Sequence, residues 1–320
     1  MERALYLDPN ELRRFKIKTG IARFFTYAFI ILMAAFIVVP FLWMIFSSLK
    51  TTNEIISREV TFFPRKFEWA NYSKLFTGIK AIDQYGNEYE AFKPMPFHWM
   101  FFNTIVVGFF TTIGTVVTTI LAAFAFSRLN FKGRELIFTI MLATMMIPGE
   151  VFVITNYMTL SRYTGWIKSA NHLENYAALI FPFITSVFYT FFLRQTFKQI
   201  PNELYLAAKV DGTSDFKYLV KVMIPLSQAT ITTIIILSMI GTWNAYIWPS
   251  FVTNSIYTNH LLVSNGLMVG LRGASETTGP NSILNLQLAA STMVTVPLLI
   301  IFFSFKKYIL RGVSRSGIKG

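Results

Sequence analysis

Glu150 is the one acidic residue that falls inside a long apolar stretch of the sequence, so its chemistry needs an explanation. At ~1.5 Å per residue, a helix that starts at Leu136 carries Glu150 about 20 Å along its axis. A carboxylate at that depth in a bilayer costs at least ~2.5 kcal/mol, so it normally faces a cavity or the interior of a helix bundle. Two roles are open: hydrogen bonding to a solute in a path across the membrane, or pairing with polar groups of neighbouring helices and with backbone amides near Pro148.

Other residues that could catalyse a reaction or bind a metal are sparse. The chain has three histidines and no cysteine, and it lacks the H-E-x-x-H pattern, so no metal site is expected. No Gly-Lys pair occurs, which excludes the phosphate-binding loop G-x-x-x-x-G-K-[ST] of ATPases. We therefore expect a chain that is not itself an enzyme and that holds no cofactor of its own.

The composition predicts an all-α membrane protein. The 320 residues are 53% hydrophobic and only 14% charged, whereas soluble proteins carry about 25% charged residues. Uncharged stretches such as Phe24–Leu49 and Trp99–Ser127 exceed the ~20 residues that cross a bilayer core. Six spans are predicted, the third bent at Pro148–Gly149, over residues 24–47, 101–127, 136–160, 176–194, 226–250 and 288–308.

The distribution of Lys and Arg predicts the orientation of these spans. The segments on one side, which include both termini, hold 19 Lys or Arg against seven acidic residues, and those on the other side hold ten against eight. By the positive-inside rule, both termini should face the cytoplasm of a cell (inner or plasma) membrane. Because the net charge of +13 gathers at span ends, nucleic acid is not expected as a partner.

This topology divides the chain into five parts. The apolar run after the basic N-terminal tail is longer than the core of a signal peptide, so a retained first span is expected. Residues 84–93 of the long external loop could form a small hairpin around Gly86-Asn87. The predicted parts are a cytoplasmic N-tail (1–23), a first transmembrane helix (24–50), an external loop (51–98), a five-helix core (99–310) and a cytoplasmic C-tail (311–320).

The cytoplasmic segment 200–225 is patterned as two short helices. Glu203 complements the positive N-terminus of the first helix, which should end at the turn signal Asp211–Gly212. Thr213 or Ser214 can cap the second helix. Four apolar residues then fall at i, i+3, i+4 and i+7 on one face: Phe216, Leu219, Val220 and Met223. This face could pack on the chain's own bundle or meet another protein.

The same segment resembles the EAA loop of type I ABC importer permeases, whose pattern is E-A-A, three residues, G, nine residues, I-x-L-P. Three residues match this pattern and three more take its last positions conservatively: Ala207, Ala208, Gly212, Val222, Ile224 and Pro225. Leu206 replaces the motif's glutamate, which in the family contacts the ATPase subunit. The resemblance therefore implies a docking contact that depends on apolar fit or on the partner permease.

Further stretches resemble the maltose-type carbohydrate importers, and matching elements run from about Asn103 to Gly320. They are residues 145–154, 191–197, 241–249 and 309–320. The resemblance implies four kinds of partner: a second homologous permease, two ATPase subunits that hold ATP and Mg, an external solute-binding protein and a sugar. It also implies that residues 264–285 reach the binding protein and that residues 311–320 lie against the ATPases.

The resemblance implies one set of site residues, and the chemistry of the side chains indicates a second. The docking set, expected to meet an ATPase subunit, is Glu203, Leu206, Ala207, Ala208, Asp211, Gly212 and Pro225. The path set combines polar groups with aromatic faces, as a sugar requires, and is Glu150, Asn156, Tyr157, Trp243 and Asn244. Each path residue has ordinary helix packing as its alternative. For the whole chain, an ion-coupled carrier and an importer of a non-sugar solute are the alternatives.

Overall fold

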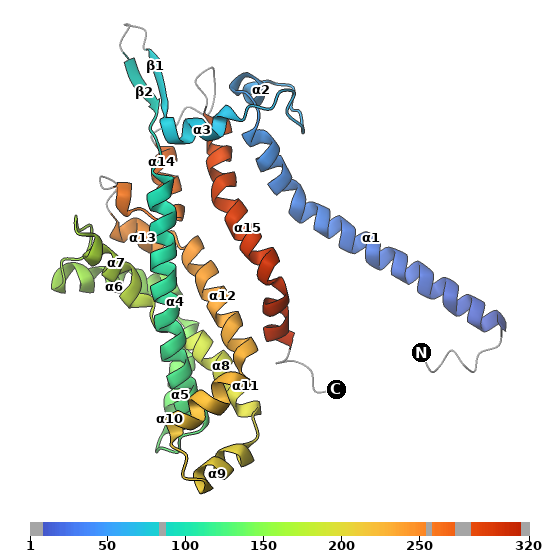
Figure 1. Cartoon of the computed structure of the whole chain (residues 1–320). Coiled ribbons are helices and arrows are strands. Elements are labelled where there is room, and N and C mark those ends of the chain that lie inside the picture. The colour runs from blue at the N-terminus through green and yellow to red at the C-terminus, as the bar shows by residue number, and fades with distance from the viewer. Residues whose placement is uncertain (1–8, 83–87, 254–257, 273–282, 315–320) are drawn as a thin grey trace. The chain divides into compact units, whose positions relative to one another are not determined.

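The computed structural model describes residues 9–82, 88–253, 258–272 and 283–314, and these are almost wholly helical (Figure 1). The longer helices are α1 Pro9–Ser48, α4 Phe97–Ser127, α5 Arg134–Ala143, α6 Gly149–Tyr163, α7 His172–Ile180, α8 Val187–Gln199, α9 Asn202–Val210, α12 Gln228–Asn244, α14 Val263–Arg272 and α15 Leu284–Ser314. The shorter elements are α2 Thr52–Ile56, α3 Ala70–Thr77, α10 Asp215–Tyr218, α11 Ile224–Leu226, α13 Ile247–Val252, the strands β1 Ile79–Ile82 and β2 Glu88–Phe92, the 3-10 turns η2 Thr144–Met146, η3 Phe181–Phe183 and η5 Thr258–His260, and the π-helix η4 Leu219–Met223.

The described residues contain three helices that are long and apolar enough to cross a membrane alone, in α1, α4 and α15. Three bent pairs pass the same test together, and counting each pair as one span gives six. The pairs are Arg134–Met146 with Gly149–Tyr163 (97°), His172–Phe183 with Val187–Gln199 (50°), and Asp215–Leu226 with Gln228–Asn244 (80°). The prediction of an all-α membrane protein is confirmed, and so is the bend at Pro148.

The chain forms two compact units, and the first comprises residues 1–73 and 276–292. Within it, the buried side chain of Asn71 donates to the carbonyl oxygens of Ser48 and Lys50, both at 2.9 Å. Its own amide oxygen accepts a hydrogen bond of 3.1 Å from Asn285. These bonds fasten the end of α1 to the first turn of α15.

The second unit comprises residues 74–275 and 293–320, and α4 packs there against both α8 and α12. Buried side chains of these helices, such as Phe124, Leu193 and Ile234, form an apolar core. Strands β1 and β2 pair antiparallel. Strand β2 falls within the hairpin expected over residues 84–93, and β1 lies before it, whereas the expected turn at Gly86-Asn87 lies outside the described residues.

The fourth span is broken between Phe183 and Val187, and side chains of α4 bond to the backbone at this break. The hydroxyl of Thr115 donates to the carbonyl oxygen of Phe183 at 2.9 Å, and that of Thr118 donates to Ile184 at 2.6 Å. A Cβ atom on Gly114 would lie 2.8 Å from Ile184 Cγ2, so only glycine allows this approach. Hydroxyl groups of a neighbouring helix thus satisfy the carbonyls that the break frees.

Candidate functional site

The segment 200–225, called the coupling segment below, folds as two helices joined by a tight turn. Helix α9 ends at Val210, and Gly212 takes the left-handed conformation with φ of 70°. The amide of Thr213 returns to the carbonyl oxygen of Ala208 at 2.8 Å, as in a helix that ends on glycine. Ser214 then caps α10 by accepting from the amide of Lys217. The two-helix prediction is confirmed, with Ser214 rather than Thr213 as the cap.

Polar side chains lock this turn from both helices. The hydroxyl of Tyr205 donates to Asp215 Oδ1 at 2.7 Å, and the ammonium of Lys209 lies 2.7 Å from the same oxygen. The hydrogen bond to Asp215 raises the pKa of Lys209 above its usual value. The angle between α9 and α10 is therefore held by a shared carboxylate.

The expectation of one apolar face on the second helix is wrong in part. Leu219 and Met223 are buried, but Phe216 and Val220 are 69% and 44% exposed. A π-helix over residues 219–223 breaks the α-helical spacing after Leu219, so the i, i+3, i+4, i+7 register does not hold over the whole stretch. Five apolar side chains of the coupling segment are exposed: Leu204, Leu206, Val210, Phe216 and Val220.

Most of the docking set is exposed. Glu203 lies in the first turn of α9, and it is exposed together with Leu206, Ala207, Asp211, Gly212 and Pro225. Ala208 is half-buried and packs against the core cluster of the bundle. The set thus belongs to one continuous segment, of which Ala208 faces the chain's own core and the others are accessible.

Two arginines support the start of the coupling segment, and Arg128 reaches the segment itself. Arg128, at the end of α4, donates to the carbonyl oxygens of Phe197 and Ile200 at 2.8 and 2.5 Å and reaches Asn202 Oδ1 at 3.4 Å. Arg194 on α8 is 3% exposed and binds both carboxylate oxygens of Glu135 at 2.7 and 2.8 Å. The joint between α8 and α9 is therefore tied to α4 and α5 by charge-assisted bonds.

We expect Arg128→Lys to loosen the joint between α8 and α9. The planar guanidinium directs several N–H groups at the carbonyl oxygens of Phe197 and Ile200 and at the side-chain oxygen of Asn202, and a lysine ammonium cannot reproduce that geometry. Hydrogen bonds to a charged group contribute about 1.5–3 kcal/mol. Trypsin should therefore cut after Lys209 roughly ten times faster or more in the purified variant. Lys132→Met, a change at an exposed cation of the same loop, should leave the rate unaltered, and an equal rate for both variants would contradict the role of Arg128.

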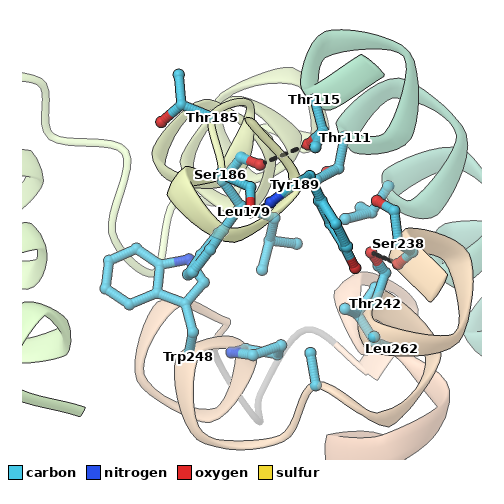
Figure 2. Close-up of a pocket in the computed structure, with 15 residues that line it drawn as sticks. Thr111, Thr115, Leu179, Thr185, Ser186, Tyr189, Ser238, Thr242, Trp248 and Leu262 are labelled. Carbon is cyan, nitrogen blue, oxygen red and sulfur yellow. Dashed lines mark hydrogen bonds between the residues drawn. The ribbon is translucent and has the colours of Figure 1, made fainter. Parts of the chain in front are cut away.

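A cavity of about 320 Å³ lies in the second unit among α4, α7, α8, α12 and α13 (Figure 2). Figure 2 shows the hydroxyl of Tyr189 directed toward Ser238 and Thr242, with the ring of Trp248 on another wall. None of the 15 residues that line the cavity is acidic or basic. Seven of them carry a hydroxyl: Thr111, Thr115, Thr185, Ser186, Tyr189, Ser238 and Thr242.

None of the five residues of the path set lines this cavity. Glu150 is exposed in the first turn of α6, where the helix dipole favours a carboxylate. Trp243 is buried and donates to the carbonyl oxygen of Val294 at 3.3 Å. Asn244 bonds the carbonyl of its own helix at Ile240, Tyr157 packs edge-on against Phe251, and Asn156 is half-buried.

The sequence alone does not predict the cavity, because its lining lacks the large polar and aromatic residues of the path set. The signal that was present is a run of threonines on an uncharged helix, at 111, 112, 115, 118 and 119. Small hydroxyl residues in a span both bond across helices and line polar cavities. Which of them face a cavity depends on the neighbouring helices, so the run alone does not separate the two roles.

Comparison with known proteins shows relatives over most of the chain. The arabinooligosaccharides transport system permease protein AraQ of Bacillus subtilis (strain 168) is 29% identical over 297 residues, which are 91% of this chain and 94% of that protein. The lactose transport system permease protein LacG of Rhizobium radiobacter is 26% identical over 282 residues, 88% and 91% of the two chains. The sn-glycerol-3-phosphate transport system permease protein UgpE of Yersinia pestis is 27% identical over 263 residues, 82% and 85%.

A solved structure shares the fold. It is a chain in the crystal structure of a bacterial ABC transporter involved in the import of the acidic polysaccharide alginate, matched with a TM-score of 0.69 over 95% of this chain and 99% of that one, at 19% identity. Residues 114–315 match a family of membrane permeases. This match spans the coupling segment and most of the helices around the cavity. The chain therefore belongs to the family of binding-protein-dependent transport system inner membrane components.

Proposed function

We propose that this chain forms half of the translocation path of an ABC importer for a sugar or oligosaccharide and couples that path to separate ATPase subunits. The family and the relatives named for arabinooligosaccharides and lactose support the importer and its substrate class. The chain is a permease subunit and not a catalytic one. ATP and Mg would accordingly be held by the ATPases.

The coupling segment is the observation that carries this proposal. Its exposed apolar side chains, Leu206 and Phe216 among them, lie on short helices fastened to the bundle through Arg128. Exposed apolar patches on a protein surface mark contacts with another protein or with a membrane, and we assign this one to a protein because the segment resembles a docking loop. Leu206 at the acidic position of the motif is 55% exposed, so the contact with the ATPase would be an apolar one made by the docking set.

The remaining partners are a second homologous permease and an external solute-binding protein. Residues 264–285 would reach the binding protein and residues 311–320 would lie against the ATPase pair, with both termini in the cytoplasm. Residues 273–282 and 315–320 of these stretches lie outside the described part of the chain. All five residues of the path set stay predictions for the path that the two permeases would enclose: Glu150, Asn156, Tyr157, Trp243 and Asn244.

An ion-coupled carrier is the second candidate, since it would also be a polytopic membrane protein. Such a carrier needs ionisable groups at its site to couple ion and solute. The cavity has no acidic or basic lining residue, which favours the importer. An importer of a non-sugar solute differs from the proposal only in substrate.

Copurification tests the assembly. When the chain is expressed together with a second permease and an ATPase from its own genome, a tag on this chain should retain both in detergent at a fixed ratio. Chain that purifies alone, and that takes up solute when an ion gradient is applied, would contradict the proposal and support the carrier.

A further inference from the structure

Part of the predicted external loop folds back along the last turns of α1. The ring centroid of Phe62 lies 5.8 Å from that of Trp43 and 5.7 Å from that of Phe46. The ring of Phe63 lies 4.8 Å from that of Phe46. Trp43 and Phe46 precede the helix end at Ser48 by ~7.5 and ~3 Å, at ~1.5 Å per residue. The two loop rings therefore lie beside the last turns of the helix and not beyond its end.

The backbone holds a second point of this loop to the end of the same helix. The amide of Glu68 donates to the carbonyl oxygen of Leu49 at 2.8 Å. Phe67 and Trp69 flank Glu68, and their rings stack with centroids 6.4 Å apart and planes 16° apart. Residues 58–69, called the return loop below, are thus fixed at the end of α1 at two points.

The end of α1 reaches a membrane surface. Helix α1 can cross a membrane alone, and the rest of the described chain buries none of its most apolar part. The uncharged stretch Phe24–Leu49 is about 39 Å long as a helix, whereas the hydrocarbon core of a bilayer is about 30 Å thick. The last turns of α1 therefore reach the headgroup layer, and the return loop packs on those turns.

The surface of the return loop combines apolar and cationic side chains. Arg58, Arg65 and Lys66 are exposed on it. Aromatic rings and cations together favour the boundary between acyl chains and headgroups, where the rings meet hydrocarbon and the cations meet phosphate. Four apolar side chains of the loop are more than half exposed: Val60 (77%), Phe63 (63%), Phe67 (54%) and Trp69 (68%).

We propose that the return loop is an anchor that lies in the phospholipid headgroup layer where α1 ends, with its aromatic rings toward the acyl chains and its cations beside the phosphates. With the N-terminus in the cytoplasm, this layer belongs to the outer leaflet. The proposal goes beyond the proposed function, because it depends on α1 crossing the membrane and not on the solute. An exposed apolar surface can also meet a protein, but the position of the loop beside the helix favours lipid over the solute-binding protein.

The chain has no cysteine, so one introduced thiol that carries a bimane dye reports the depth of the loop. Val60→Cys is the test site, because Val60 is exposed and is not one of the rings that fix the loop. Helix α1 supplies two controls. Phe36→Cys is 77% exposed and lies ~18 Å before the helix end, and Arg13→Cys is exposed and lies ~52 Å before it.

The full chain is reconstituted in vesicles of equal parts phosphatidylcholine and phosphatidylglycerol. Three quenchers are compared: a phospholipid with a nitroxide near its glycerol, a phospholipid with a nitroxide at the end of an acyl chain, and iodide on both sides of the membrane. The nitroxide near the glycerol should quench Val60→Cys more than the nitroxide at the chain end does. Phe36→Cys should show the reverse order, and Arg13→Cys should lose fluorescence to iodide alone.

Removing the exposed rings tests their part in the anchor. Adding Phe67→Ser and Trp69→Ser to Val60→Cys should lower quenching by the nitroxide near the glycerol toward the level of Arg13→Cys. Adding Phe216→Ser, which removes a similarly exposed ring from the coupling segment, should leave that quenching unchanged.

Three results would overturn the anchor. The first is quenching of Val60→Cys by iodide alone, and the second is unchanged lipid quenching after both serine substitutions. The third is iodide quenching that the solute-binding protein abolishes while neither phospholipid quenches, since the return loop would then meet that protein instead of lipid.

Discussion

Replacing Ala207 by arginine is expected to abolish ATP-driven uptake while the chain still folds and inserts in the membrane. Ala207 is exposed on α9, so a longer side chain meets no obstacle within the chain itself. In an apolar contact with an ATPase, the same guanidinium would be buried without a counter-charge, which costs several kcal/mol. The variant should therefore keep wild-type thermal stability but lose the ATPase on copurification, or hydrolyse ATP without transport.

Asn130→Arg is the matched control, because Asn130 is exposed in the loop after α4, outside the docking set.

Gly212→Val tests the same contact through the backbone. A Cβ there meets open space, but φ of 70° disfavours a β-branched residue, so α9 and α10 should lose their fixed angle. Normal assembly and uptake in both Ala207→Arg and Gly212→Val would refute the docking assignment.

Glu135→Gln is expected to cause the largest loss of folded protein. Arg194 is almost fully buried, and its guanidinium relies on Glu135, with further contacts to the carbonyl oxygen of Phe126 at 3.0 Å and the ring of Phe138 at 3.8 Å. Leaving a buried charge unpaired costs about 3–5 kcal/mol. Because the side chain of Glu135 is 57% exposed, water replaces part of the lost pairing, and the loss of stability should be smaller than that of a fully buried pair.

The measurement is the temperature at which the purified protein unfolds, together with the amount recovered from membranes. Glu59→Gln is the control, since its pair with Arg65 is exposed on both sides and contributes at most about 1 kcal/mol. Combining Glu135→Gln with Arg194→Met should recover much of the stability, because a buried ion pair replaced by apolar groups is often neutral. A double variant no better than Glu135→Gln alone would contradict this account of Arg194.

The sequence predicted those features that short-range chemistry decides. Gly212 and Ser214 mark the turn of the coupling segment by residue type, and Pro148 marks the bend of the third span. The break before α8 was not predictable, because it depends on Thr115 and Thr118 of a helix more than sixty residues away in the chain.

The site was less predictable than the fold for a related reason. The π-helix over residues 219–223 interrupts a periodic pattern that is typical of an ordinary α-helix, and Phe216 and Val220 are exposed although the pattern places them on a buried face. Trp243 is buried and donates to the carbonyl oxygen of Val294, and this packing could not be predicted from its residue type. Thr111 lines the cavity only because α8 and α12 pack around it. A threonine in an apolar helix does not by itself predict that position.

Solute uptake into proteoliposomes tests the central claim most directly. The chain would be reconstituted with its second permease and ATPase subunits, with ATP on the side of the ATPases and the binding protein with labelled sugar on the other side. We predict uptake that requires both ATP and the binding protein, that is unaffected by dissipating ion gradients, and that is lost with Ala207→Arg. Uptake without ATP that follows an imposed ion gradient would contradict the account.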